Sequence, residues 1–173
     1  MKTIVTAEQI PLIIKRLAYC IAENHPDLAN TVFIGLQPRG VYFSNRLVQE
    51  LNEVYNANVK YGQLDITMYR DDIHRGIHIP KTTKIDFSIE GKNVILIDDV
   101  LYTGRTIRAA IDALMDFGRP EKVGLCVLVD RLLTRELPIQ PNFVGKTVDS
   151  LYSDKVLVHW TETEGKDEII LID

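Results

Sequence analysis

The sequence is poor in cysteine and has no long apolar run. It holds two cysteines, Cys20 and Cys126, each within a hydrophobic segment. Two thiols cannot supply a four-ligand metal site, and we expect both to be buried and reduced. No stretch approaches 18 consecutive apolar residues, and the first residues lack the apolar run and small-residue cleavage site of a secretory signal. We therefore expect a cytoplasmic protein with no membrane span.

An excess of basic charge is also missing. The chain has 24 acidic residues against 20 Lys and Arg, a net charge of −4. That balance argues against a dedicated nucleic-acid binder, although it is compatible with a local basic face. The remaining composition, 46% hydrophobic and 25% charged over 173 residues, is that of an ordinary globular protein. One domain over residues 1–173 fits this length.

Apolar runs of strand length alternate with segments of helical periodicity. We predict helices over 6–24, 41–51 and 104–117, and strands over 31–36, 59–68, 93–98, 123–129, 155–160 and 168–172. Strands that are apolar throughout and alternate with helices predict an α/β fold, a central parallel sheet with helices on both faces. Ligands bind such sheets at the carboxyl ends of the strands, so candidate sites follow residues 36, 68, 98 and 129.

The stretch 70–84 differs from the rest of the chain. It is rich in charge, contains two histidines, and shows no periodicity. Such a segment within a compact domain is typical of a functional lid or a floppy insertion.

The segment 94–106 combines an apolar strand, two acids and a helix start. Its residues are VILIDDVLYTGRT, so Asp98 and Asp99 fall at the carboxyl edge of the sheet. The small and hydroxyl residues after them open a helix, whose N-terminal N–H groups favour anions. A ligand with vicinal hydroxyls and a phosphate suits both halves. The alternative is that the two acids only end a strand and cap a turn.

This 13-residue string resembles the phosphoribosyl-pyrophosphate (PRPP) motif of type I phosphoribosyltransferases. It is not a Walker A loop, because the spaced glycines and the Gly-Lys pair are absent. The resemblance covers nearly the whole chain. Within the family, the chain looks most like the uracil phosphoribosyltransferases that also regulate pyrimidine operons, on the strings TMYRDD, IDDVLYTGRT, GRP, VLVDR and RELPI. The resemblance implies the type I phosphoribosyltransferase fold, with a mobile lid over about 69–86 and a small C-terminal hood over about 130–173.

The resemblance also implies roles for individual residues. Asp98, Asp99, Arg39 and Arg70 would be catalytic, Arg39 at the leaving pyrophosphate and Arg70 at the transition state. The pyrophosphate loop would be Gln37, Pro38, Arg39 and Gly40. The phosphate-binding residues would be Val100, Leu101, Tyr102, Thr103, Gly104, Arg105 and Thr106. Mg²⁺ would be held mainly through PRPP oxygens and water, with no dedicated protein cage.

The base would be met by Asp130, Arg131, Phe143 and Val144, with Phe143 stacked on it. Phe143 could equally be a plain core residue. Purine transferases of this class place an aspartate four residues after the first acid of the motif, where this chain has Tyr102. Tyrosine, with an ordinary pKa of about 10, is a poor base near neutral pH. Uracil, with its more acidic N–H, is therefore favoured, and a xanthine, guanine or hypoxanthine transferase is the alternative.

The regulatory side of the resemblance implies further partners. UMP would act as the signal, pyrimidine-operon leader RNA as the target, and the protein would be a homo-oligomer. The candidate RNA contacts are Lys15, Arg16, Arg135 and Lys146. Lysines and arginines on a helix more often form only a solvated face.

Overall fold

The main sheet has five parallel strands in the order β3-β2-β4-β5-β6. This computed structural model describes residues 1–71, 81–151 and 153–172. The strands are β2 (Thr31–Leu36), β3 (Lys60–Leu64), β4 (Asn93–Leu101), β5 (Lys122–Leu132) and β6 (Phe143–Asp149). The predicted parallel α/β fold is confirmed.

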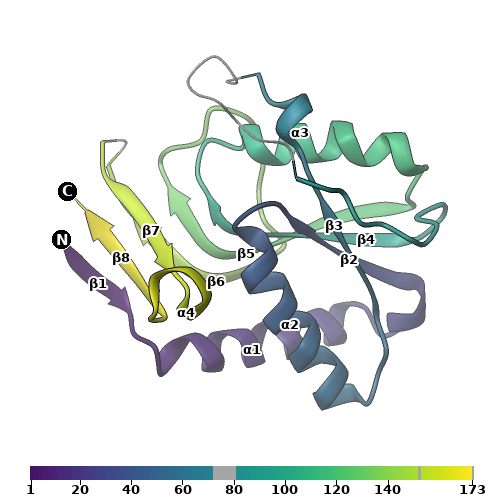
Figure 1. Cartoon of the computed structure of the whole chain (residues 1–173), viewed down its shortest axis with the longest axis horizontal. Helices are drawn as coiled ribbons and strands as arrows, with labels where there is room; N and C mark the ends of the chain where they lie inside the picture. Colours follow the sequence, from purple (N-terminus) through teal and green to yellow (C-terminus); the bar gives the residue numbers. More distant parts are fainter. Residues whose placement is uncertain (72–80, 152, 173) are drawn as a thin grey trace.

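Helices cover both faces of this sheet (Figure 1). Helices α1 (Gln9–Asn24) and α2 (Gly40–Tyr55) lie on one face, and α3 (Arg105–Leu114) lies on the other. Successive side chains of a strand point to opposite faces. Accordingly, Ile95 and Ile97 of β4 pack with α1 and α2, whereas Val94 and Leu96 pack with α3. Within the described residues, no helix is long and apolar enough to cross a membrane.

A second, antiparallel sheet stands beside the first and joins the two ends of the chain (Figure 1). It contains β1 (Lys2–Val5), β8 (Glu168–Ile172) and β7 (Lys155–His159), in that order, with the short helix α4 (Thr161–Glu164) between β7 and β8. The predicted hood began near residue 130. Instead, the last residues of β5 and all of β6 belong to the main sheet, and the small sheet recruits the N-terminal strand.

Arg46 of α2 ties this small sheet to the main body. Its guanidinium makes a two-pronged contact with Asp167, at 2.6 and 3.1 Å, and a 2.8 Å contact with Glu162. It also lies over the ring of the buried Trp160, 4.7 Å from the centroid. Bidentate and cation–π contacts fix orientation as well as distance. The α4 segment is therefore held in one place relative to α2.

Some element boundaries differ from the prediction. The predicted strand 59–68 ends at Leu64, and a single 3₁₀ turn, Thr67–Tyr69, follows. Asp65 causes this turn, because its carboxylate accepts hydrogen bonds from the backbone N–H and the hydroxyl of Thr67. The predicted strand 93–98 instead runs to Leu101, so the two acids are part of β4.

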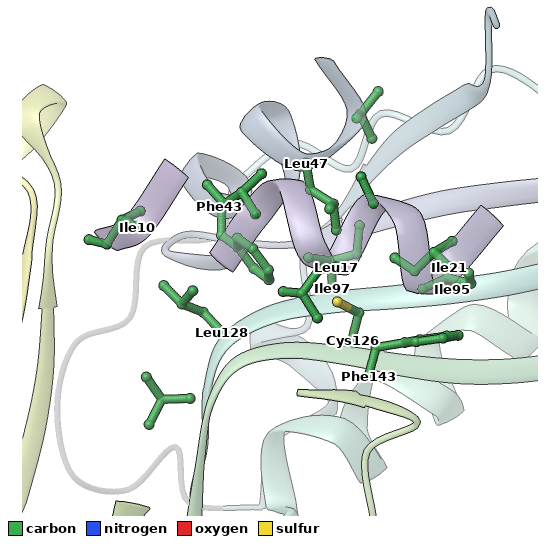
Figure 2. Packing of buried hydrophobic residues seen from close by; sticks show 14 of the residues in the cluster. Ile10, Leu17, Ile21, Phe43, Leu47, Ile95, Ile97, Cys126, Leu128 and Phe143 are labelled. Carbon is green, nitrogen blue, oxygen red and sulfur yellow. The ribbon is translucent and has the colours of Figure 1, made fainter. Parts of the chain in front are cut away.

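The structure corrects the interpretation of Phe143 as a base-stacking residue. Phe143 is the first residue of β6, is 8% exposed, and belongs to the core beneath α1 and α2. Figure 2 shows it beside Cys126, its neighbour in β5, among residues of that core. Its ring lies 6.0 Å from that of His25, at the end of α1. Of the two interpretations left open by the sequence, the core one holds.

We predict that Phe143 contributes to stability as a core residue. Phe143→Ala should lower the free energy of unfolding by about 3 kcal/mol, because it leaves a cavity under α1. Phe143→Leu, which keeps most of the volume, should cost about 1 kcal/mol. Urea denaturation followed by circular dichroism measures both. An alanine variant within about 0.5 kcal/mol of the wild type would show instead that the site is not packed.

Candidate functional site

Two neighbouring carboxylates, Asp98 and Asp99, end the unbroken run of buried residues in β4. They are only 7% and 8% exposed. The backbone N–H of Asp99 donates to Asp98 Oδ1 at 2.9 Å, and that of Val100 donates to Asp99 Oδ1 at 2.8 Å. Each acid therefore has one oxygen fixed by the chain itself.

Burial sets the protonation of this pair. It raises the pKa of Asp98 well above the usual carboxyl range, and the adjacent charge of Asp99 raises it further. Burial also raises the pKa of Asp99, but the nearby Arg39 opposes that shift. The positive charge of Arg70 lowers the pKa of Asp98. The charges of Arg39 and Arg70 therefore oppose the effect of burial on the pKa values of this pair.

The turn between β2 and α2 meets the acids from the next strand. A side chain at Gly40 would place its Cβ 2.8 Å from the carbonyl oxygen of Ile97 and 3.0 Å from Asp98 Oδ1. Only glycine permits this approach, so the start of α2 rests directly on the acidic end of β4. The peptide bond between Gln37 and Pro38 is cis. The side chain of Gln37 points toward β3, since its amide donates to Gln63 Oε1 and to the carbonyl of Thr82, each at 3.2 Å.

Arg39 joins this turn to two other parts of the molecule. Its Nε lies 3.4 Å from Asp99 Oδ2 and its Nη1 lies 3.4 Å from Glu164 Oε1, while its Nη2 donates to the carbonyl of Val158. Glu164 was not found by sequence reasoning, because a lone acid in a four-residue helix gives no signal. Hydrogen bonds from Thr163 and the backbone of Trp160, helped by Arg39, lower the pKa of Glu164 to about 2. Arg39 therefore has a carboxylate on either side.

The loop after β4 forms the N-terminus of α3. Gly104 has a φ of +93°, which favours glycine, and a Cβ there would meet Ile139 at 3.0 Å. The carbonyl of Thr103 accepts from the backbone of Glu136 at 3.0 Å and Leu137 at 3.2 Å, so the 133–142 loop braces the turn. The N–H groups of a helix start attract anions.

Two of the predicted phosphate-binding residues lie outside this loop. Val100 and Leu101 still belong to β4, and Leu101 is buried in the core on the α3 side. The backbone N–H of Val100 is taken by Asp99. The anion-binding candidates are thereby narrowed to residues 102–106.

Three of the predicted base-binding residues, Asp130, Arg131 and Val144, lie near the end of β5, whereas Phe143 lies in the core. Asp130 and Arg131, at the end of β5, lie against Tyr102: the Arg131 guanidinium is 4.1 Å from the Tyr102 ring centroid. Asp130 pairs with Arg135, whose Nη1 donates to the carbonyl of Tyr102 at 2.5 Å. Val144, in β6, lines the same cavity as Asp130 and Arg135, and its carbonyl accepts from Arg16 at 3.3 Å.

Of the four predicted RNA contacts, Lys15, Arg16 and Lys146 lie along α1 and β6, and Arg135 lies beside Asp130. Arg16 donates to the carbonyls of Val144 and Gly145, and Arg135 belongs to the Asp130 pair. Lys15 and Lys146 are exposed. The predicted lid centres on residues 72–80, which lie outside the described residues. Within the described ranges, no three His, Cys, Asp or Glu side chains gather as a metal site would require.

Comparisons with known proteins agree with this geometry. Residues 1–162 match the family described as phosphoribosyl transferase domain. The chain is 45% identical over 172 residues to "Bifunctional protein PyrR" of Limosilactobacillus fermentum, covering 97% of this chain and 96% of that protein. It is 49% identical over 160 residues to the protein of that name from Ligilactobacillus salivarius, covering 90% and 89%.

Solved structures share the fold at lower identity. A hypoxanthine phosphoribosyltransferase from Staphylococcus aureus superimposes with a TM-score of 0.74 at 21% identity, covering 98% of this chain and 90% of that one. A hypoxanthine-guanine phosphoribosyltransferase from Bacillus anthracis gives 0.68 at 20% identity, covering 86% and 83%. At these identities the likeness shows the fold alone and does not select a base.

The raised pKa of Asp98 predicts a pH-dependent cost to stability. A carboxyl whose pKa is higher in the folded than in the unfolded chain contributes stability at low pH and loses it as pH rises through the folded value. Asp98→Asn removes this loss, while its amide oxygen can still accept from Asp99 N–H. The variant should unfold at a higher temperature than the wild type at pH 8, and the difference should shrink toward about pH 4.

Thermal unfolding across this pH range measures the effect, with Glu23→Gln on the exposed face of α1 as control. Equal melting temperatures of Asp98→Asn and wild type at pH 8 would contradict the assigned burial of charge.

Proposed function

The chain belongs to the phosphoribosyltransferase domain family, and on that premise we propose that it joins uracil to PRPP, giving UMP and pyrophosphate. The observation that carries this is the buried Asp98–Asp99 pair, with Arg39 on one side and the N-terminal loop of α3 on the other. A sugar carrying hydroxyls, a phosphate and a pyrophosphate matches these three neighbouring features.

The acidic pair would bind the ribose and stabilise charge. Departure of pyrophosphate leaves positive charge on the anomeric carbon, and carboxylates fixed in a buried site stabilise such charge without reorganising. The same carboxylates can accept hydrogen bonds from the ribose hydroxyls. A cationic centre beside the pair would lower both pKa values and so oppose the upward shift that burial causes.

Asp98 and Asp99 offer two hard carboxylate donors, and the described residues contain no cluster of three such ligands. This arrangement fits Mg²⁺ that is carried mainly by the substrate. Asp98 and Asp99 would share in holding it. When bound, Mg²⁺ would neutralise charge on the pyrophosphate oxygens.

The two ends of PRPP would lie on opposite sides of the acids. The 5′-phosphate suits residues 103–106, where backbone N–H groups and two hydroxyls meet the start of α3. The pyrophosphate suits the 37–40 turn. There, Arg39 would exchange its contact with Glu164 for the phosphate oxygens, which offer the stronger charge.

The surroundings of Tyr102 favour uracil as the base. The position holds a phenol packed against the Arg131 guanidinium, rather than a carboxylate that could accept a purine ring proton. The nearby carboxylate of Asp130 is neutralised by Arg135. Both arrangements support a base that needs little help to lose its proton, and purine transfer remains the alternative outcome of the assay.

We predict release of pyrophosphate from PRPP and Mg²⁺ with uracil, and much slower release with hypoxanthine, guanine or xanthine. A panel of bases measured by coupled pyrophosphate detection decides between them. Comparable rates with guanine would transfer the assignment to purine salvage.

The double variant Asp98→Asn with Asp99→Asn should lose activity by about a hundredfold or more while remaining folded.

A second function, UMP-dependent binding of pyrimidine-operon leader RNA, is supported by the resemblance to the bifunctional regulators. Lys15 and Arg16 of α1 and Lys146 of β6 are exposed. Arg16, which stands next to Lys15, is engaged with strand carbonyls. Because Arg16 and Arg135 are engaged within the protein, the test of RNA binding uses Lys15 and Lys146.

We predict that Lys15→Ala with Lys146→Ala weakens RNA retention and lowers its salt dependence. The reason is that each lost phosphate contact reduces the log–log salt slope by about 0.7 for single-stranded RNA. Lys60→Ala with Lys155→Ala, which removes equal charge elsewhere, is the matched control. Filter binding with and without UMP measures it. Identical curves for both double variants would remove this face as the RNA site.

A further inference from the structure

The residues on either side of Arg70 are both bound to α3 or to the 3₁₀ turn, Met115–Phe117, that follows it. The carbonyl of Tyr69 accepts from Arg108 Nη2 at 3.2 Å, and the Tyr69 hydroxyl donates to Asp116. That hydroxyl bond raises the pKa of Tyr69, as expected for a phenol that donates to a carboxylate. One neighbour of Arg70 is therefore held by its backbone and by its side chain.

The other neighbour is held by charge. Asp71 Oδ2 lies 2.7 Å from Arg105 Nη1 and 3.8 Å from Arg108 Nη2. Arg105 and Arg108 are three residues apart and so share one face of α3. Each is braced from its other side, Arg105 by Glu136 at 2.6 Å and Arg108 by Asp112 at 2.7 Å. The two cations thus meet residues 69–71 in a fixed orientation.

Arg70 itself is directed toward the candidate site. Its Nη1 donates to the hydroxyl of Thr106 at 3.4 Å, and its charge acts on Asp98. Thr106 lies in the first turn of α3, one residue from Arg105. The helix that binds the two neighbours of Arg70 therefore also carries the phosphate-binding loop.

We propose that Tyr69 and Asp71 are positioning residues, which clamp the chain to α3 so that Arg70 points at the acidic pair and the phosphate loop. The kinetic consequence rests on the proposed function. The clamp itself does not, because it is a statement about the orientation of one side chain.

The clamp should affect orientation much more than stability. Asp71 and Arg105 are each about two-fifths exposed, 42% and 41% for their side chains, and such ion pairs contribute little to folding. A guanidinium on a long side chain, however, loses its alignment when the backbone beneath it is released. Small misplacements of a group near the reacting atoms slow chemistry strongly.

The test compares Asp71→Asn with Asp112→Asn. Both remove a carboxylate that contacts Arg108, but only the first removes a contact between residues 69–71 and α3. The Nε–Hε signal of Arg70 is followed by ¹H–¹⁵N NMR of the whole chain and assigned by its loss in Arg70→Lys. We expect a distinct signal in the wild type and in Asp112→Asn, and its merger with the averaged arginine signals in Asp71→Asn. An unchanged Arg70 signal in Asp71→Asn overturns the proposal, whether or not the protein is active.

Kinetics provide the second readout. In Asp71→Asn we expect kcat to fall about tenfold with the KM for uracil little changed, because the base is not touched. Introducing Asp71→Asn into Arg70→Lys should slow the enzyme no further. Independent, multiplying losses in the double variant would contradict action through Arg70. A wild type without uracil transfer would reject the proposed function alone, since the NMR result stands by itself.

Discussion

The burial of two adjacent carboxylates at the end of β4 is the constraint on which the rest of the site depends. Each carboxylate would be costly in an apolar sheet without partners. The structure offsets the cost with backbone N–H donors for one oxygen of each acid and with Arg39 for the remaining oxygen of Asp99. Part of the cost of burial persists as the raised pKa of Asp98. A cationic reaction centre beside Asp98 would reduce that cost. Stability and activity are therefore in opposition at Asp98.

Helix α2 connects this pair to the small sheet. Arg39 precedes its first turn and reaches Val158 and Glu164, while Arg46, two turns on, holds Asp167 and Trp160. Both arginines contact the same segment around α4. Because the start of α2 rests on Asp98 through Gly40, the small sheet is positioned relative to the acids by one continuous helix. Helix α3 has the matching role on the other side, with the phosphate loop at its start and residues 69–71 along its face.

Sequence reasoning found the parts that depend on local pattern. The apolar run before Asp98, the glycine and threonines after it, and the helix that follows are consecutive, so their juxtaposition is encoded within one short segment. Arg39 was named because its turn resembles the pyrophosphate loop of the family, and the structure places it beside Asp99. The contacts that sequence missed join distant segments: Arg39 with Glu164, Arg105 with Asp71, and Arg16 with Gly145. Sequence periodicity cannot predict such contacts, because the residues that they join are 34 to 129 positions apart.

Phe143 shows the opposite failure, in which a resemblance assigned function to a residue that the fold uses for packing. Phe143 fills the core beneath α1, and Arg16 reaches across it to the carbonyls of Val144 and Gly145. The contact of Arg16 with β6 also bears on aggregation. Strand β6 is the last of its sheet, and the bare edge of a sheet is a template for adding strands from other molecules. Arg16 places a positive charge beside β6, and a charged side chain at a sheet edge disfavours the addition of further strands.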